Sequence, residues 1–284
     1  MAKLGKLMKN QKERCMKINM LGTGSALVTE YFNTCFTISS ENGEVMLVDG
    51  GGGNELLRRL KRVGIKWQDI HHIFITHKHI DHILGLIWII RLVCQNAASG
   101  KYNGTATIYA NEEVIGIFER FCRDVLPKVQ HDQIGKALFF VRLRDGDVHE
   151  MIGHRFRFFD IGSTKASQMG FAMSHHDKQN YLCCLGDEPF NPVCMSFVKG
   201  CQWLMHEAFC LFSEAEIHKP YEKHHSTVKD ACSLATELSV PNLILYHTEE
   251  THLHDRKQLY SSEGKNYYKG NLFVPEDLEE IEIG

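Results

Sequence analysis

The chain has 284 residues, a formal net charge of −3 and 43% apolar residues, so it is long enough and apolar enough to bury a substantial core. The small negative charge argues against a generic nucleic-acid binder, which carries a large excess of basic residues. No Pro/Ser-rich linker, low-complexity run or solenoid repeat divides the sequence. We therefore predict a single domain over residues 16–284, preceded by a lysine-rich, mobile or lightly packed extension over residues 1–15.

The cysteines and the apolar segments indicate a cytoplasmic location. The ten cysteines show no repeated C-x-x-C spacing, and several lie inside apolar runs, as expected for reduced thiols. No apolar core follows the basic N-terminus, so no signal peptide is predicted. The apolar run from Ile83 to Val93 is short and contains Arg91, so we predict a buried helix and no membrane segment.

The predicted elements alternate between strands and helices. We expect strands at residues 17–21, 34–39, 45–48, 70–75, 105–110, 138–143, 156–161, 171–174, 181–185, 203–205 and 242–246. We expect helices at residues 54–63, 83–95, 112–126 and 226–238. Asn42-Gly43 is the predicted hairpin turn between two of the strands. The third strand ends at Asp49, and the four glycines that follow allow close approach of another element.

The segment Thr76-His77-Lys78-His79-Ile80-Asp81-His82 comes directly after a predicted buried strand. Three imidazoles and a carboxylate fall within six residues, His77 to His82. On a loop, His77 and His79 can face one point while Asp81 and His82 turn toward a second point. Imidazole nitrogen and carboxylate oxygen suit zinc and similar cations. The alternative is a solvated, histidine-rich turn.

This H-x-H-x-D-H pattern resembles the motif of the metallo-β-lactamase superfamily of two-metal hydrolases. The strand–helix alternation matches the α/β fold of that superfamily, a four-layer αβ/βα sandwich with metals at the edge where strands end. Asp187 and His247 also stand at predicted strand ends and look like the bridging aspartate and the last histidine of the superfamily. The resemblance further implies that Asp49 supports the histidine loop from behind, an ordinary turn carboxylate being the alternative.

Two further motifs resemble those of ribonuclease Z, the tRNA 3′-processing endonuclease branch. Met205-His206-Glu207-Ala208-Phe209 matches its H-E-A motif, and His224-His225-Ser226-Thr227 matches its H-S-T motif. The resemblance implies that Glu207 pairs with His225, which donates a proton to the leaving oxygen; a purely structural pair is the alternative. The helix that Ser226 and Thr227 open is expected to offer its N-terminus to a phosphate. His206 and His224 are expected to be structural.

The sequence departs from the family in two places. Six residues before Gly170-Phe171, where the family has a ligand histidine, this chain has Thr164, and residues 155–174 contain no histidine. One ligand of the first metal is therefore missing, and His175 and His176 are the substitutes considered. The tRNA-binding arm is expected after Phe171, but only a short hairpin precedes Asp187.

The predicted function is a metal-dependent hydrolase, either a phosphodiesterase or a ribonuclease Z-like endonuclease, with a weakened first zinc site. Manganese and iron are alternative metals, the substrate is a phosphodiester such as RNA, and a homodimer is left open. Other hypotheses are a same-fold hydrolase of a cyclic nucleotide, lactone or thioester, and a non-catalytic binding relative with a damaged site. The predicted metal ligands are His77, His79, Asp81, His82, Asp187 and His247, and the catalytic residues are Asp81, His225 and Glu207.

Overall fold

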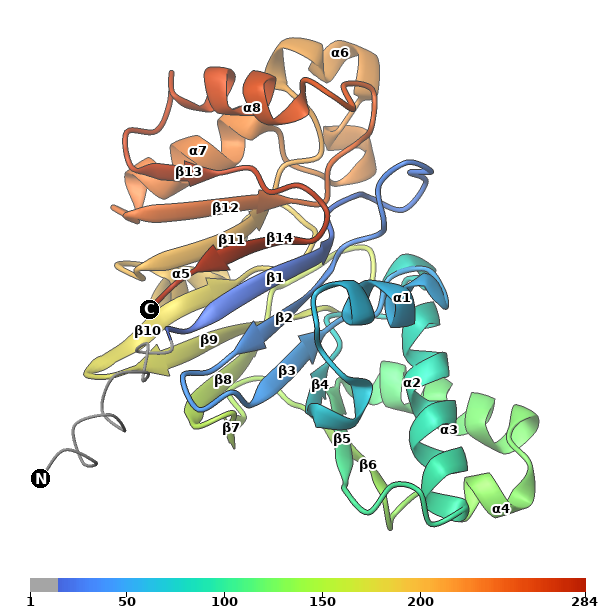
Figure 1. The fold of residues 1–284 in the computed structure, drawn as a ribbon. Coiled ribbons are helices and arrows are strands. Elements are labelled where there is room, and N and C mark those ends of the chain that lie inside the picture. The colour runs from blue at the N-terminus through green and yellow to red at the C-terminus, as the bar shows by residue number, and fades with distance from the viewer. Residues whose placement is uncertain (1–14) are drawn as a thin grey trace, which may run out of the picture.

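A computed structural model describes residues 15–284, so the predicted N-terminal extension lies outside the described residues except for Cys15. Over these described residues the strands form two seven-stranded sheets (Figure 1). The sheets pack face to face, and helices cover the outer face of each sheet. This is the four-layer αβ/βα sandwich that the sequence predicted.

The first sheet contains strands from the N-terminal half of the chain and one strand from its C-terminal end. Its spatial order is β14 (Glu279–Glu282), β1 (Lys17–Gly22), β2 (Cys35–Ser39), β3 (Val45–Val48), β4 (Ile70–Phe74), β5 (Ala106–Ala110) and β6 (Leu138–Arg142). Strands β3 to β6 run parallel to one another. Their carboxyl ends therefore meet at one edge of the sheet.

The second sheet has a similar plan. Its spatial order is β13 (Asn271–Phe273), β12 (Asn242–Tyr246), β11 (Trp203–Glu207), β10 (Lys178–Cys184), β9 (Met169–His175), β8 (His154–Asp160) and β7 (Val148–Met151). Strands β10 to β13 are parallel, so their carboxyl ends also share an edge. Strands β9 and β10 form a hairpin with only His176 and Asp177 between them, which confirms the predicted short connection.

The helices divide between the two outer layers (Figure 1). Those next to the first sheet are α1 (Glu55–Arg62), α2 (Ile80–Ala98), α3 (Glu112–Val125) and α4 (Lys128–His131). Those on the side of the second sheet are α5 (Met195–Val198), α6 (Ala215–His218), α7 (Val228–Glu237) and α8 (Arg256–Gly264). Short 3₁₀ turns occur at η1 (Trp67–Asp69), η2 (Pro192–Cys194), η3 (Phe212–Glu214) and η4 (Tyr221–Lys223).

The apolar core is layered like the fold. One buried cluster lies between the helices and the first sheet, one between the sheets, and one between the second sheet and its helices. In the middle cluster the Phe74 ring lies 4.9 Å from Phe158 and 5.8 Å from Phe171. Each such buried ring stabilises the fold by about 1.5–3 kcal/mol through area burial. The two sheets are therefore a rigid support for the loops at their edges.

Helix α2 begins earlier than predicted. It starts at Ile80 instead of residue 83, and the amides of His82 and Ile83 donate to the His79 carbonyl at 3.0 and 3.2 Å. Asp81 and His82 thus stand in its first turn, not in a loop as expected. By length and composition alone α2 could span a bilayer, yet half of its apolar stretch is buried inside the protein. Its residues Leu86 and Ile90 pack in the core.

Strands β7, β13 and β14 and helix α8 were not predicted. Strand β14 has the sequence Glu-Glu-Ile-Glu, in which only Ile281 is buried. It pairs antiparallel with β1, opposite Ile18. Such short, charged strands have little local signal, because their pairing depends on a partner distant in the chain.

Candidate metal centre

Direct packing between α2 and the glycine loop after β3 positions the motif. A Cβ on Gly85 would lie 1.8 Å from the Gly50 carbonyl oxygen, so only glycine fits there. The Gly50 amide donates to the His82 carbonyl at 2.7 Å, and the Gly85 amide donates to Gly51 at 2.9 Å. The predicted close approach at the four glycines is therefore present, and the element that approaches is the helix that carries His82.

Asp49 connects the start of the motif to its end. Its carboxylate accepts hydrogen bonds from the Thr76 amide at 2.9 Å and the Thr76 hydroxyl at 2.8 Å. It also accepts from His82 Nδ1 at 2.7 Å. Because Nδ1 then carries the proton, the Nε2 lone pair of His82 faces the centre of the site. Asp49 therefore holds the histidine loop through hydrogen bonds on the side away from the metal centre, as the family resemblance implied.

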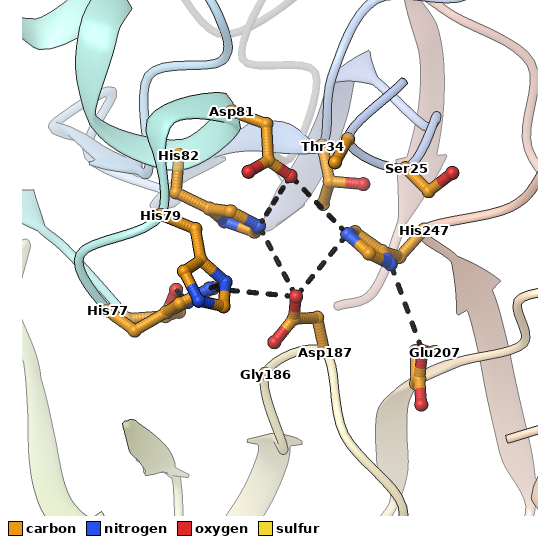
Figure 2. Close-up of polar contacts among 12 residues, drawn as sticks. Ser25, Thr34, His77, His79, Asp81, His82, Gly186, Asp187, Glu207 and His247 are labelled. Atoms are coloured by element: carbon orange, nitrogen blue, oxygen red, sulfur yellow. Dashed lines mark hydrogen bonds and ion pairs between the residues drawn. The ribbon is translucent and has the colours of Figure 1, made fainter. Parts of the chain in front are cut away.

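The six predicted ligand residues come together at the carboxyl edge of both sheets (Figure 2). Asp187 lies at the centre of the group. Its Oδ2 is 3.6 Å from His77 Nε2, 3.6 Å from His82 Nε2 and 3.4 Å from His247 Nε2. Asp81 Oδ2 is 3.3 Å from His82 Nε2 and 3.6 Å from His247 Nε2. One carboxylate oxygen thus faces three imidazoles, two from the histidine motif and one from the end of β12.

The residues divide into two groups that could each hold a cation. The first is His77, His79 and Asp187, and the second is Asp81, His82 and His247. His77 Nε2 and His79 Nδ1 are within hydrogen-bond distance at 2.8 Å, but the separations of 3.3–3.6 Å between carboxylate oxygens and imidazole nitrogens exceed ordinary hydrogen bonds. They match the edge of about 3.3 Å that a tetrahedral zinc shell with bonds of about 2.0 Å requires. Among the described residues, the buried Nε2 atoms of His82 and His247 have no hydrogen-bond partner. The donors therefore fit divalent cations.

The pKa shifts of the residues at the centre also indicate a cation site. Burial alone would raise the pKa of Asp187, but His77, His82 and His247 hold it well below its usual range. Burial lowers the pKa of His77. Burial also opposes protonation of His82, but Asp49 and Asp81 raise the pKa of that ring well above normal. In the absence of cations the carboxylates retain protons on neighbouring imidazoles, and cations would replace those protons.

Gln168 is a site residue that the sequence analysis missed. Its side-chain amide donates to Asp187 Oδ1 at 2.7 Å, and its side-chain oxygen accepts from the Asp187 amide at 2.8 Å. The side chain is fully buried. It occupies one oxygen of Asp187 and leaves the other oxygen for the centre. No local sequence signal marks such a contact, because the two residues lie on different strand ends.

His247 is positioned by two features, the turn that follows β1 and the side chain of Arg256. The Ser25 amide donates to the Thr248 carbonyl at 2.9 Å, and the Thr248 amide donates to the Thr23 carbonyl at 3.0 Å. The buried Arg256 donates to the hydroxyls of Thr23 and Thr248 at 2.9 and 2.8 Å. His247 itself has a positive φ of 58°, a backbone conformation that such surrounding contacts must hold.

Glu207 and His225 are in contact beside the centre. His225 Nδ1 donates to Glu207 Oε2 at 2.7 Å, and the Ser226 amide donates to Glu207 Oε1 at 2.7 Å. Phe209 stacks on the His225 ring at 4.9 Å. A cavity of about 510 Å³ opens next to these side chains. Its lining includes Ser25, Leu27, Val28, Phe209, His218, Lys223, His225, Glu249 and Glu250.

The N-terminus of α7 is not the open phosphate site that was expected. Thr227 is its N-cap and forms a capping box with Asp230. The Thr227 amide donates to Asp230 Oδ2 at 2.9 Å, and the Asp230 amide donates to Thr227 Oγ1 at 3.3 Å. The Ser226 and Val228 amides are also used, by Glu207 and by the Cys210 carbonyl. These amides are satisfied internally and have no hydrogen to offer a ligand.

None of the positions considered for the missing histidine completes the first group. Thr164 is exposed, and its hydroxyl lies 3.3 Å from His224 Nδ1. His175 ends strand β9, which starts at Met169 beside Thr76, so it lies about 20 Å along the strand from the motif. The suggestion that His175 or its neighbour His176 substitutes as a ligand is therefore wrong.

Comparison with known proteins identifies the family. The family model described as "Anti-Pycsar protein Apyc1" matches residues 16–264. The chain belongs to this family. Ribonuclease Z from Azobacteroides pseudotrichonymphae is 24% identical over 259 residues, which cover 82% of this chain and 88% of that relative.

Solved structures share the fold of the Apyc1-family chain. The metallo-β-lactamase fold protein YhfI from Bacillus subtilis has a TM-score of 0.74 at 15% identity, over 94% of this chain and 99% of YhfI. A diphosphatase from the PhnP family has a TM-score of 0.69 at 18% identity, over 94% of this chain and 96% of that chain. The chain is a ribonuclease Z-like member of the metallo-β-lactamase superfamily, as its motifs predicted.

Proposed function

We propose that this protein is a metal-dependent phosphodiesterase with a ribonuclease Z-like catalytic centre. The observation that carries the proposal is the position of Asp187 Oδ2, within 3.4–3.6 Å of three imidazoles, two from the histidine motif and one from the end of β12. A buried carboxylate surrounded in this way is suited to bridge two cations. The ribonuclease Z relative supports a hydrolase.

Two sets of donors would hold the cations. His77, His79 and Asp187 would hold the first, and Asp81, His82, His247 and Asp187 the second. Zinc suits these nitrogen and oxygen donors best, with manganese and iron as alternatives. When bound, such a pair of cations polarises a phosphoryl oxygen and activates water at neutral pH.

Asp81 is the proposed group that positions the attacking water and accepts its proton. Burial alone would raise the pKa of Asp81, but contacts with His82 and His247 hold it well below its usual range. The carboxylate is therefore ionised at neutral pH and can accept a hydrogen bond from water. It stands in the first turn of α2, whose packing on the glycine loop fixes its direction.

His225 is the proposed general acid, with Glu207 as its orienting partner. The hydrogen bond from Nδ1 to Glu207 leaves Nε2 as the ring atom that can donate to a leaving oxygen. His225 also lines the cavity of about 510 Å³, where a leaving group would lie.

The cavity favours a small phosphodiester over a folded RNA. A volume of about 510 Å³ lies within the range of small-molecule sites and admits a nucleotide-sized substrate. The β9–β10 hairpin is short, so it offers no arm to grip a tRNA. A cyclic nucleotide is one candidate of this size. An RNA endonuclease activity is the second candidate, favoured by the paired Glu207 and His225 of the two ribonuclease Z motifs.

A substrate screen with metal-analysed protein tests the proposal. We expect turnover of an aryl phosphodiester and of a cyclic nucleotide, with poor cleavage of precursor tRNA. Efficient processing of precursor tRNA would favour the RNA endonuclease. Turnover of a lactone or thioester alone would show a different hydrolase, and fully metal-loaded protein without any turnover would indicate a binding relative.

A further inference from the structure

A second group of possible metal ligands lies far from the catalytic centre. Glu41, His154 and His175 each present one donor atom, and the three donor atoms lie within 4.8 Å of one another. We call this group the distal cluster. Glu41 stands in the turn between β2 and β3, before the amino end of β3, whereas the catalytic centre begins at the carboxyl end of β3. The distal cluster is therefore at the opposite end of the sandwich.

The geometry of the distal cluster resembles an incomplete coordination shell. His154 Nε2 forms a hydrogen bond of 3.2 Å with Glu41 Oε2, and His175 Nδ1 lies 3.5 Å from the other carboxylate oxygen, Glu41 Oε1. The two imidazole rings are 5.2 Å apart. Around a tetrahedral zinc with bonds of about 2.0 Å, neighbouring ligand atoms are separated by about 3.3 Å. Small side-chain movements would bring all three donors to one cation.

The surroundings hold these donors in place. His175 is only 6% exposed, and its ring packs against Tyr181 at 4.7 Å. A Cβ on Gly153, in the turn before His154, would lie 3.6 Å from Asn42 Nδ2, so this turn packs on the turn that carries Glu41. Gly153 has a positive φ of 76°, which the tight turn requires. The cluster thus rests on two rigid turns and a strand end.

We propose that Glu41, His154 and His175 form a structural zinc site that joins the two sheets at the end remote from catalysis. Two imidazole nitrogens and one carboxylate oxygen suit zinc, whereas calcium and magnesium prefer oxygen alone. Glu41 belongs to the first sheet, and His154 and His175 belong to the second. A cation held by all three would cross-link the sheets and stabilise the folded chain.

Zinc stoichiometry in full-length variants tests the site. The protein is treated with a chelator, reloaded with zinc and dialysed, and its bound zinc is then counted. We expect Glu41→Gln and His154→Ala each to bind one equivalent fewer than the parent protein. Glu41→Gln keeps the size of the side chain and its hydrogen-bonding oxygen, so it decides the question if His154→Ala fails to fold. Equal zinc content in the parent and in Glu41→Gln would overturn the proposal.

His149→Ala is the matched control. His149 lies on β7, next to β8, and its ring contacts Tyr109 and Phe158. Its removal should leave the zinc content unchanged. Added zinc should also raise the melting temperature of the parent by more than that of Glu41→Gln, and equal shifts in both would contradict a cross-link. Phosphodiesterase activity should stay within about twofold in Glu41→Gln, so the result does not depend on the proposed function.

Discussion

The two histidine clusters sit at opposite ends of the same sandwich and differ in charge and burial. The catalytic centre places Asp81 and Asp187 among four imidazoles, with Asp49 behind them. The distal cluster has one carboxylate, Glu41, whose side chain is 35% exposed. Two buried carboxylates, one of them shared between both groups, suit a pair of cations, whereas one partly exposed carboxylate suits a single ion. Similar residues can therefore support either catalysis or a structural cross-link. The number of carboxylates and their burial decide between these two roles.

Replacing Asp187 should have the largest effect, and it should change metal binding at the catalytic centre but not at the distal cluster. Asp187→Ala removes the oxygen shared by three imidazoles, so metal occupancy should fall at both catalytic sites and phosphodiesterase activity should fall by about 10⁴-fold or more. Elemental analysis and a rate assay measure these losses. The distal cluster should keep its zinc. A variant that retains all its catalytic metal would contradict the assignment of Asp187 as a bridge.

Replacing His225 should affect substrates according to their leaving group. His225→Ala should slow cleavage of a poor alkoxide leaving group by about 100-fold or more, because that oxygen needs a proton. An aryl oxide leaves without one, so its rate should change little. His224→Ala is the matched control, since His224 is adjacent but contacts Thr164. Equal losses on both substrate types would argue against an acid role for His225.

The catalytic centre should also make metal-free protein less stable at alkaline pH. Burial alone would lower the pKa of His247, but Asp81 and Glu207 raise it from 6.5 to about 9. Because the folded state holds this proton more tightly than the unfolded state does, the resulting stability is fully present below about pH 6.5. It is lost as the pH rises through about 9, and the loss amounts to roughly 3 kcal/mol.

Urea unfolding of chelator-treated protein across this pH range measures the effect. Reloading with zinc should remove most of the dependence, because cations replace the protons. In the distal cluster, burial lowers the pKa of His175. Glu41→Gln should therefore leave the pH profile of the metal-free protein unchanged. A flat profile in the parent would contradict the charge arrangement around His247.

The smallest expected effect concerns the two catalytic sites themselves. The first group has three candidate ligands, whereas the second, with Asp187, has four. Chelator titration of catalytic metal should thus proceed in two steps, with affinities that differ by roughly tenfold to 100-fold. Thr164→His should merge the steps if residue 164 is the family ligand position. If both metals leave together in the parent, the position of the missing ligand must be sought elsewhere in the chain.

Much of the candidate site could be predicted from the sequence, because its ligands stand at strand ends. A buried apolar strand followed by His77-Lys78-His79 is a local pattern, and the order of Asp187, Glu207, His225 and His247 matched a known family. The alternation of strands and helices matched the four-layer fold that the family resemblance implied. Such signals are contained in neighbouring residues, so they need no knowledge of distant contacts.

Only the tertiary structure decided which residues support these ligands and which do not reach them. Gln168 and Arg256 act through hydrogen bonds to residues distant in sequence, so no local pattern identifies them. The amides at the start of α7 were expected to be free, but the capping box with Asp230, the Glu207 carboxylate and the Cys210 carbonyl occupy four of them. His175 was weighed as a catalytic ligand, but the length of β9 carries it to the opposite end of the sheet, beside Glu41. Hydrogen bonds, strand length and packing partners depend on the folded chain, and therefore these features emerge only in three dimensions.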